Sequence, residues 1–232
     1  MFIGHYGVSL AAKRCEPRIS LGWLFVAVQF LDILFSIFVL AGIEKMRIVP
    51  GFTAVNPYDL YFMPYSHSLV GALVWSAVFG AGFLLASRST AVQRRWMAAT
   101  ILAGAVFSHF VLDVPVHTPD LPLGPGPDSP KIGLGLWNHR AATIAAELVV
   151  LFAGALIYLR ATRPLTRAAT VATVIFGLVL VSATVATPFM PIPPGAAAFV
   201  VQALVFYAAL ALAAAYVDRR RIARQPEVTT RP

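Results

Sequence analysis

The sequence predicts an all-α fold: a polytopic membrane helical bundle of six transmembrane helices, preceded by a short amino-terminal re-entrant or interfacial helix. Hydrophobic residues make up 59% of the 232 residues, charged residues make up 12%, and the mean hydropathy is +0.77. This balance is too apolar for a soluble domain of this size. Several apolar runs reach the roughly 20 residues that cross a hydrocarbon core, and helices are the spanning structure that such runs support.

The apolar runs indicate one transmembrane domain, residues 1–217, followed by a basic and disordered cytoplasmic tail, residues 218–232. The six predicted spans are residues 21–42, 66–87, 96–114, 140–159, 167–187 and 196–217. The last two spans are rich in Ala and Val and nearly free of ionisable groups, which is typical of scaffold. Residues 2–12 are apolar but too short to span. We expect them to form a re-entrant helix that brings His5 to the depth of Asp32; the alternative is a surface helix with His5 among the headgroups.

The net charge of +8 is distributed by loop and not in one patch, which argues against nucleic-acid binding. With the amino terminus inside, fourteen of the eighteen basic residues fall in cytoplasmic segments. They are Lys13, Arg14, Arg18, Arg88, Arg94, Arg95, Arg160, Arg163, Arg167, Arg219, Arg220, Arg221, Arg224 and Arg231. This asymmetry satisfies the positive-inside rule with both termini cytoplasmic. Cys15 is the only cysteine, which excludes an internal disulfide and a thiolate metal cluster within one chain.

Ionisable side chains lie where the hydrocarbon core is expected. Asp32 is near the middle of the first span, where an unpartnered carboxylate costs on the order of 3 kcal/mol. It therefore needs a cation, a proton or a metal; the structural alternative is a protonated Asp in a helix-packing hydrogen bond. His109 and Asp113 are four residues apart on the third span, so both project from one helix face. This spacing is typical of a ligand pair.

Two further histidines lie at predicted helix ends. His67 opens the second span between Ser66 and Ser68, whose hydroxyls either cap the helix or hold the imidazole in one tautomer. Pro115 is expected to end or kink the third span, which leaves His117 just beyond the break. The connection 115–139 contains six prolines and predicts neither helix nor strand. It is interpreted either as a lid or substrate guide or as an inert external linker.

The fourth span begins with Arg140 and carries Glu147 two turns further in. Arg140 is placed to meet an anionic headgroup or phosphate, and Glu147 and His117 are the candidate catalytic residues because they can carry protons. The candidate substrate contacts are Ser66, Ser68, His139 and Arg140. As an alternative, Arg140 and Glu147 pair with each other, since they are seven residues apart on one helix face.

The intramembrane groups together supply three imidazoles and two carboxylates for a divalent transition metal. The candidate metal ligands are His5, Asp32, His67, His109 and Asp113. Nitrogen and oxygen donors without thiolate suit zinc first, with manganese or iron as alternatives, as one ion or as two ions that share a carboxylate. An open metal position favours hydrolysis, because the metal activates its bound water and polarises an ester or phosphoryl oxygen. The sequence therefore predicts a membrane-embedded metal-dependent hydrolase that acts on a lipid or a membrane-associated ester or phosphoester.

The order of these motifs resembles the YdjM-like inner-membrane, predicted metal-dependent hydrolases over about residues 1–120. The matching stretches are Gly4-His5, Leu31-Asp32-Ile33, Ser66-His67-Ser68, and Ser108-His109 followed by Asp113. Members of that family carry GH near the start, LPDIDH at a helix end, HRGxTHS, and SHxxxD. The resemblance implies that the same five residues are metal ligands. The predicted topology is that of a bacterial inner (plasma) membrane protein, and the depth of the ionisable groups indicates a site that opens to the outer side.

The chain departs from that family pattern in two places. Leu34 stands where the second acid of LPDIDH is expected, and Met63-Pro64-Tyr65 replaces HRG. These losses argue against a two-metal site and leave two alternatives open. The same residues form a transition-metal or proton pathway in a small transporter, or the chain is a non-catalytic membrane protein with a degenerate metal site. The absence of an internal repeat in the sequence is a modest argument against transport.

Overall fold

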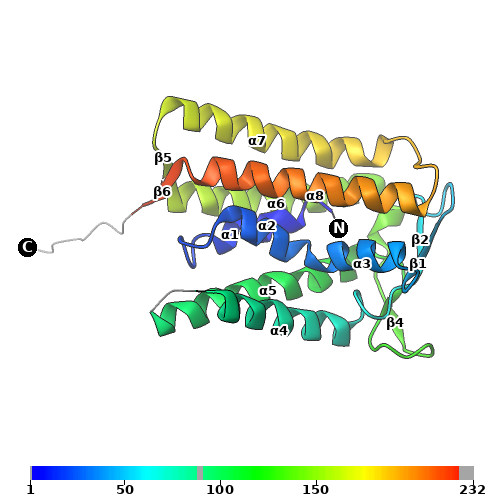
Figure 1. Cartoon of the computed structure of the whole chain (residues 1–232). Coiled ribbons are helices and arrows are strands. Elements are labelled where there is room, and N and C mark those ends of the chain that lie inside the picture. The colour runs from blue at the N-terminus through cyan, green and yellow to red at the C-terminus, as the bar shows by residue number, and fades with distance from the viewer. Residues whose placement is uncertain (1, 88–90, 225–232) are drawn as a thin grey trace, which may run out of the picture.

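The computed structural model describes residues 2–87 and 91–224 and confirms the predicted all-α helical bundle (Figure 1). The helices are α1 (His5–Ala12), α2 (Leu21–Val28), α3 (Phe30–Leu40), α4 (Leu69–Ala86), α5 (Val92–Val116), α6 (Arg140–Ala161), α7 (Arg167–Ala186) and α8 (Ala196–Asp218). Two short 3-10 helices are η1 (Leu136–Asn138) and η2 (Thr187–Phe189). Most helices lie roughly along one direction and surround α1 and α2.

Within the described residues, five helices, α4 to α8, are each long and apolar enough to cross a membrane, and there are up to six spans if the bent pair of α2 and α3 counts as one. The chain is therefore a multi-pass membrane protein. The first predicted span is broken at Gln29, where the two helices meet at 55°. Gln29 is fully buried, and a helix break at membrane depth is tolerated where protein surrounds it. The other helices agree with the predicted spans to within a few residues.

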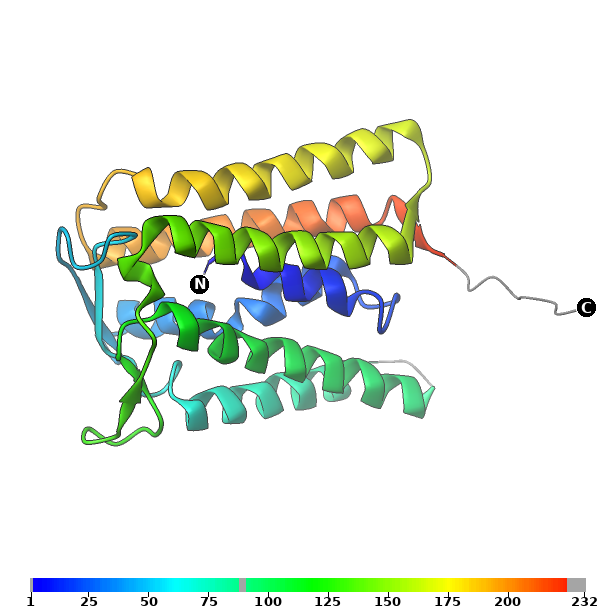
Figure 2. The same cartoon turned by 180° about the vertical axis from the view of Figure 1, so that it is seen from behind.

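The first helix, α1, lies inside the bundle and not at its surface. It packs against α2, α5 and α6 (Figure 2), and both His5 and Tyr6 are fully buried. The backbones of α1 and α6 approach so closely that a Cβ at Gly154 would clash with the Gly7 carbonyl. Of the two predicted arrangements, this is the re-entrant one, because α1 is buried inside the bundle. Glycine at the crossing lets the backbones of α1 and α6 come this close.

Short antiparallel hairpins cover one end of the bundle. β1 (Lys45–Ile48) pairs with β2 (Tyr58–Phe62), and β3 (Leu121–Pro122) pairs with β4 (Lys131–Ile132). A third pair, β5 (Thr162–Pro164) with β6 (Arg221–Ala223), lies at the opposite end (Figure 1). The tail predicted to be disordered thus begins with a paired segment, while residues 225–232, with Arg231, lie outside the described residues, as does Arg88.

The connection 115–139 is more ordered than its prolines predict. α5 continues through Pro115 to Val116, and His117 follows with extended backbone. The β3–β4 hairpin then folds back, so that the Gly135 amide donates to the His117 carbonyl at 2.7 Å. The prediction of neither helix nor strand was wrong here, because η1 and the hairpin satisfy the backbone locally. Through η1, the Trp137 ring packs against the His117 ring, with a centroid separation of 4.1 Å.

Candidate metal centre

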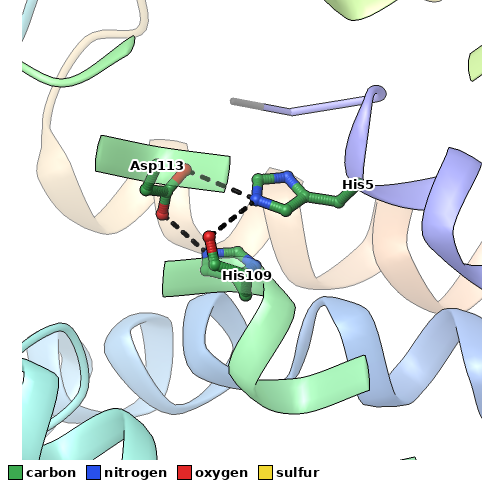
Figure 3. Close-up of side chains that lie close together, drawn as sticks. All are labelled: His5, His109 and Asp113. Atoms are coloured by element: carbon green, nitrogen blue, oxygen red, sulfur yellow. Dashed lines mark hydrogen bonds and ion pairs between the residues drawn. The ribbon is translucent and has the colours of Figure 1, made fainter. Parts of the chain in front are cut away.

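Residues from five separate segments converge inside the bundle, on the side of the break between α2 and α3. The structure brings all the predicted metal ligands together and adds His117. The group consists of His5 in α1, Asp32 in α3, His67 before α4, His109 and Asp113 in α5, and His117 after α5. We call these six residues the His/Asp cluster. All except Asp32 are buried to 3% exposure or less, and Figure 3 shows three of them facing one another.

Each imidazole turns its Nε2 atom toward a carboxylate of the cluster. The Nε2 atom of His109 lies 3.1 Å from Asp113 Oδ2 and 3.5 Å from Asp32 Oδ1. The Nε2 atom of His67 lies 3.3 Å from Asp32 Oδ1 and 3.9 Å from Asp113 Oδ2. His5 approaches Asp113 Oδ1 at 3.4 Å, and His117 approaches Asp113 Oδ2 at 3.6 Å. The two carboxylates are therefore the common targets of four rings.

Acceptors outside the cluster fix three of the four rings through their other nitrogen. His109 Nδ1 donates to the Val28 carbonyl at 2.6 Å, at the break that ends α2. His117 Nδ1 donates to Asp120 Oδ1 at 2.9 Å. A carbonyl or carboxylate oxygen can only accept, so the proton of each neutral ring is on Nδ1. The lone pair of Nε2 therefore faces into the cluster.

The third ring, His67, is held through a serine. Ser66 Oγ donates to Glu44 Oε2 at 2.5 Å, so its own lone pair accepts the Nδ1 proton of His67 at 2.7 Å. Glu44 also accepts the backbone amides of Tyr65 and Ser66, both at 2.8 Å, and is 1% exposed. This chain of contacts leaves the Nε2 lone pair of His67 facing Asp32. In histidine metal sites, the ring nitrogen that does not bind the metal usually donates to another group, and this contact orients the ring.

The remaining ring, His5, has acceptors on both nitrogens. Its Nδ1 lies 3.2 Å from the Phe2 carbonyl, and its Nε2 lies 3.3 Å from the His109 carbonyl beside Asp113. The His5 and His109 rings stack at 4.0 Å between centroids. A neutral imidazole can donate only once, so one nitrogen of His5 faces an acceptor without a proton between them.

Lone pairs that face carboxylates repel unless a cation lies between them. His109 Nε2 is buried and has no hydrogen-bond partner among the described residues. Most of the Nε2-to-carboxylate distances exceed the usual 2.7–3.2 Å range of an N–H···O hydrogen bond. Donors bound at about 2.0–2.1 Å to one tetrahedral ion lie about 3.3–3.4 Å apart, which matches the spacing in the cluster. Two triads, His5/His109/Asp113 and Asp32/His67/His109, could each hold a metal ion.

Asp32 is the one ligand with appreciable exposure, since its side chain is 22% exposed. Its other oxygen, Oδ2, accepts the Tyr207 hydroxyl at 3.0 Å and lies 3.4 Å from Gln29 Nε2. Sequence reasoning missed Tyr207, Gln29 and Glu44. Nothing in the apolar context of Tyr207 marks it, whereas Glu44 could have been suspected as a carboxylate directly after a span.

Of the other predicted site residues, His117 belongs to the His/Asp cluster and Ser66 contacts it through His67, whereas the rest lie outside it. Glu147 accepts the backbone amides of Phe2 and Gly4, each at 3.1 Å, and so anchors the start of α1. Arg140 donates through Nε and Nη2 to the Ala54 carbonyl at 3.0 and 2.8 Å. The two side chains thus have different partners, instead of the alternative pairing with each other.

The remaining two candidates for substrate contact have ordinary structural positions. Ser68 caps α4 by accepting the Gly71 amide at 2.9 Å, so the two serines beside His67 divide the roles of cap and ring holder. His139 is exposed at the start of α6, next to Arg140. Arg140 is held at the hairpin-covered end of the bundle by its contact with Ala54, between β1 and β2.

No protein-family model, curated protein or solved structure matches the chain. The resemblance to the YdjM-like hydrolases therefore stays a prediction, and the geometry of the cluster has to carry the functional argument by itself.

Proposed function

We propose that the chain is a membrane-embedded metal-dependent hydrolase, acting on a lipid or a membrane-associated ester or phosphoester. The observation that supports this proposal is the orientation of the buried rings. Three imidazoles with the proton fixed on Nδ1, joined by His5, direct Nε2 at Asp32 and Asp113. Ionisable side chains buried at membrane depth, as these are, are costly and are typical of a functional site.

The donor set favours zinc, with manganese or iron as alternatives, because it offers nitrogen and oxygen without sulfur. Asp113 turns Oδ1 to His5 and Oδ2 to His109, His67 and His117, so its two oxygens suit either one ion or two that share it. A divalent ion bound there supplies an acidified water and polarisation of an ester or phosphoryl oxygen.

The residues of the chain divide the remaining tasks. Asp120 holds His117 in one tautomer, which suits His117 either as a further ligand or as a proton carrier beside the ion. Glu147, the other residue predicted to be catalytic, fits a positioning role better, because both its oxygens accept the amides that start α1. The exposed side of Asp32 is the side from which we expect substrate to approach, with Tyr207 orienting the carboxylate.

The same proposal gives the protein an orientation in a bacterial inner membrane. The α1–α2 turn, the end of α4, the start of α5, the α6–α7 connection and β6 lie at one end of the bundle, and most of the basic residues fall in or beside these described segments (Figure 1). The positive-inside rule then makes this end cytoplasmic and the hairpin end external. Arg140 and His139 are exposed at this external end, and in this proposal the part of Arg140 not used on Ala54 meets an anionic headgroup.

Hydrolysis by the purified protein in mixed micelles tests the proposal. We expect turnover of phospholipid or short-chain ester substrates that stops after chelation and returns after zinc or manganese is restored. Asp113→Asn should abolish this turnover, while Asp59→Asn, a matched change at the β2 hairpin, should keep it. Metal-loaded protein without activity on either substrate class contradicts a hydrolase. Zinc or proton flux into proteoliposomes by such protein would then favour the transporter, and the absence of flux would favour a degenerate site.

A further inference from the structure

A cavity of about 340 Å³ lies at the end of the bundle opposite the β1–β2 and β3–β4 hairpins. It is bounded by the α1–α2 turn, the end of α4 and the start of α5. Three arginines line it, Arg18, Arg94 and Arg95, together with the aromatic rings of Trp23 and Phe83. It therefore combines a cationic part with an apolar wall, and it does not include any member of the His/Asp cluster.

The cationic part of this cavity has unused hydrogen-bonding capacity. Arg95 donates through Nη2 to the Leu84 carbonyl, but its Nε atom is buried without a hydrogen-bond partner among the described residues. Buried polar atoms in native proteins are nearly always paired, with protein or with a bound molecule. The one carboxylate in the lining, Glu16, accepts the backbone amide of Arg18 at 3.1 Å. The described lining residues thus carry an excess of two positive charges.

The start of α5 adds a second feature that favours an anion. Its N-cap residue, Ala91, provides no side-chain cap, and its first turn holds Arg94 and Arg95 but no acid. Cations are unfavourable at the positive end of a helix dipole, and free amides there bind anions. α7 is a useful contrast, because it also begins with an arginine, Arg167, but Thr166 caps it by accepting the Ala169 amide at 3.1 Å.

We propose that this cavity binds the phosphate of an anionic phospholipid, held by Arg94 and Arg95 at the start of α5. Trp23 is 58% exposed on the flank of α2, where an acyl chain of the same lipid can lie against it and Phe83. Basic pockets between spans at the cytoplasmic surface are typical headgroup sites. Free phosphate has the same charge chemistry but makes no use of the apolar wall, so the lipid is the better fit.

Native mass spectrometry of the full-length protein in detergent tests this site with phosphatidylglycerol and phosphatidylcholine. We expect one phosphatidylglycerol to be retained in preference to phosphatidylcholine. Arg94→Gln and Arg95→Gln should each weaken this binding by about tenfold or more, since each removes a charge-assisted hydrogen bond. Arg167→Gln, the control at a capped helix start, should bind as the wild type does. Arg94 is exposed, so its variant remains informative if Arg95→Gln fails to fold.

Three results would overturn the proposal. The first is equal retention of both lipids, and the second is the same loss in Arg167→Gln as in Arg94→Gln, which would indicate surface charge alone. The third concerns the source of the phosphate. If inorganic phosphate at the lipid's concentration displaces phosphatidylglycerol while Trp23→Ala leaves binding unchanged, the site recognises free phosphate and not a lipid.

Discussion

Ser66 orients His67, and replacing it with alanine isolates that role. Ser66→Ala removes the acceptor of the His67 Nδ1 proton, which lies at 2.7 Å, and one of the donors to Glu44. A buried donor left without a partner costs about 1–3 kcal/mol. That range corresponds to about 5- to 150-fold weaker metal binding, which includes the 10- to 100-fold usual for losing a group that orients a ligand. Because Glu44 keeps both of its backbone-amide contacts, the loop before α4 should stay in place.

Competition with a fluorescent zinc chelator measures this affinity, and Ser68→Ala provides the control. Ser68 is two residues away from Ser66 but caps α4 through the Gly71 amide. Its replacement should lower stability by about 1 kcal/mol, as expected for a lost N-cap, without changing the zinc dissociation constant. Wild-type zinc affinity in Ser66→Ala, or equal losses in both serine variants, would refute the reasoning that the Ser66 hydroxyl acts through the His67 ring.

Three further predictions follow from the same contacts. Tyr207→Phe removes the hydroxyl that Asp32 accepts and should weaken zinc binding about threefold to tenfold in the chelator assay, with little change in melting temperature; unchanged affinity would argue against an orienting role. Glu147→Gln should lower thermal stability by about 1–3 kcal/mol, because it weakens the charged contacts to the start of α1; lost turnover at full stability and metal content would instead indicate a catalytic Glu147. Gly154→Ala should destabilise the fold by about 3 kcal/mol in denaturant or thermal unfolding, because its Cβ meets the Gly7 carbonyl; a neutral result would mean that α1 and α6 are further apart.

Composition predicts the spans of this chain because the hydrocarbon core limits the choice of structure. A run of about 20 apolar residues has to be a helix in lipid, whatever its neighbours are. The same solvent argument marks Asp32, His109 and Asp113, since ionisable groups at membrane depth need partners. Depth, together with the four-residue spacing of His109 and Asp113, grouped these residues in the prediction, and the structure places them in one cluster.

The depth of a residue in the membrane does not predict the contacts that depend on how the helices pack. The break at Gln29, which presents the Val28 carbonyl to His109, depends on buried neighbours and not on a local proline or glycine. Tyr207 is 175 residues from Asp32 in the chain, and only the packing of α8 against α3 brings them into contact. Glu147 shows the converse case. Its position within a span predicts a catalytic role, but its carboxylate accepts the backbone amides at the start of the re-entrant helix α1.

Metal content by elemental mass spectrometry tests the central claim, that the His/Asp cluster is a metal centre. We predict near-stoichiometric zinc, manganese or iron, one or two ions per chain, in wild-type protein purified in detergent. Asp113→Asn should lose this metal because its two oxygens face four rings, while Asp59→Asn should keep it. Wild-type protein that stays metal-free after supplementation with all three metals would contradict the account. Shared protons, in place of a metal ion, would then have to account for the close approach of the buried His and Asp side chains.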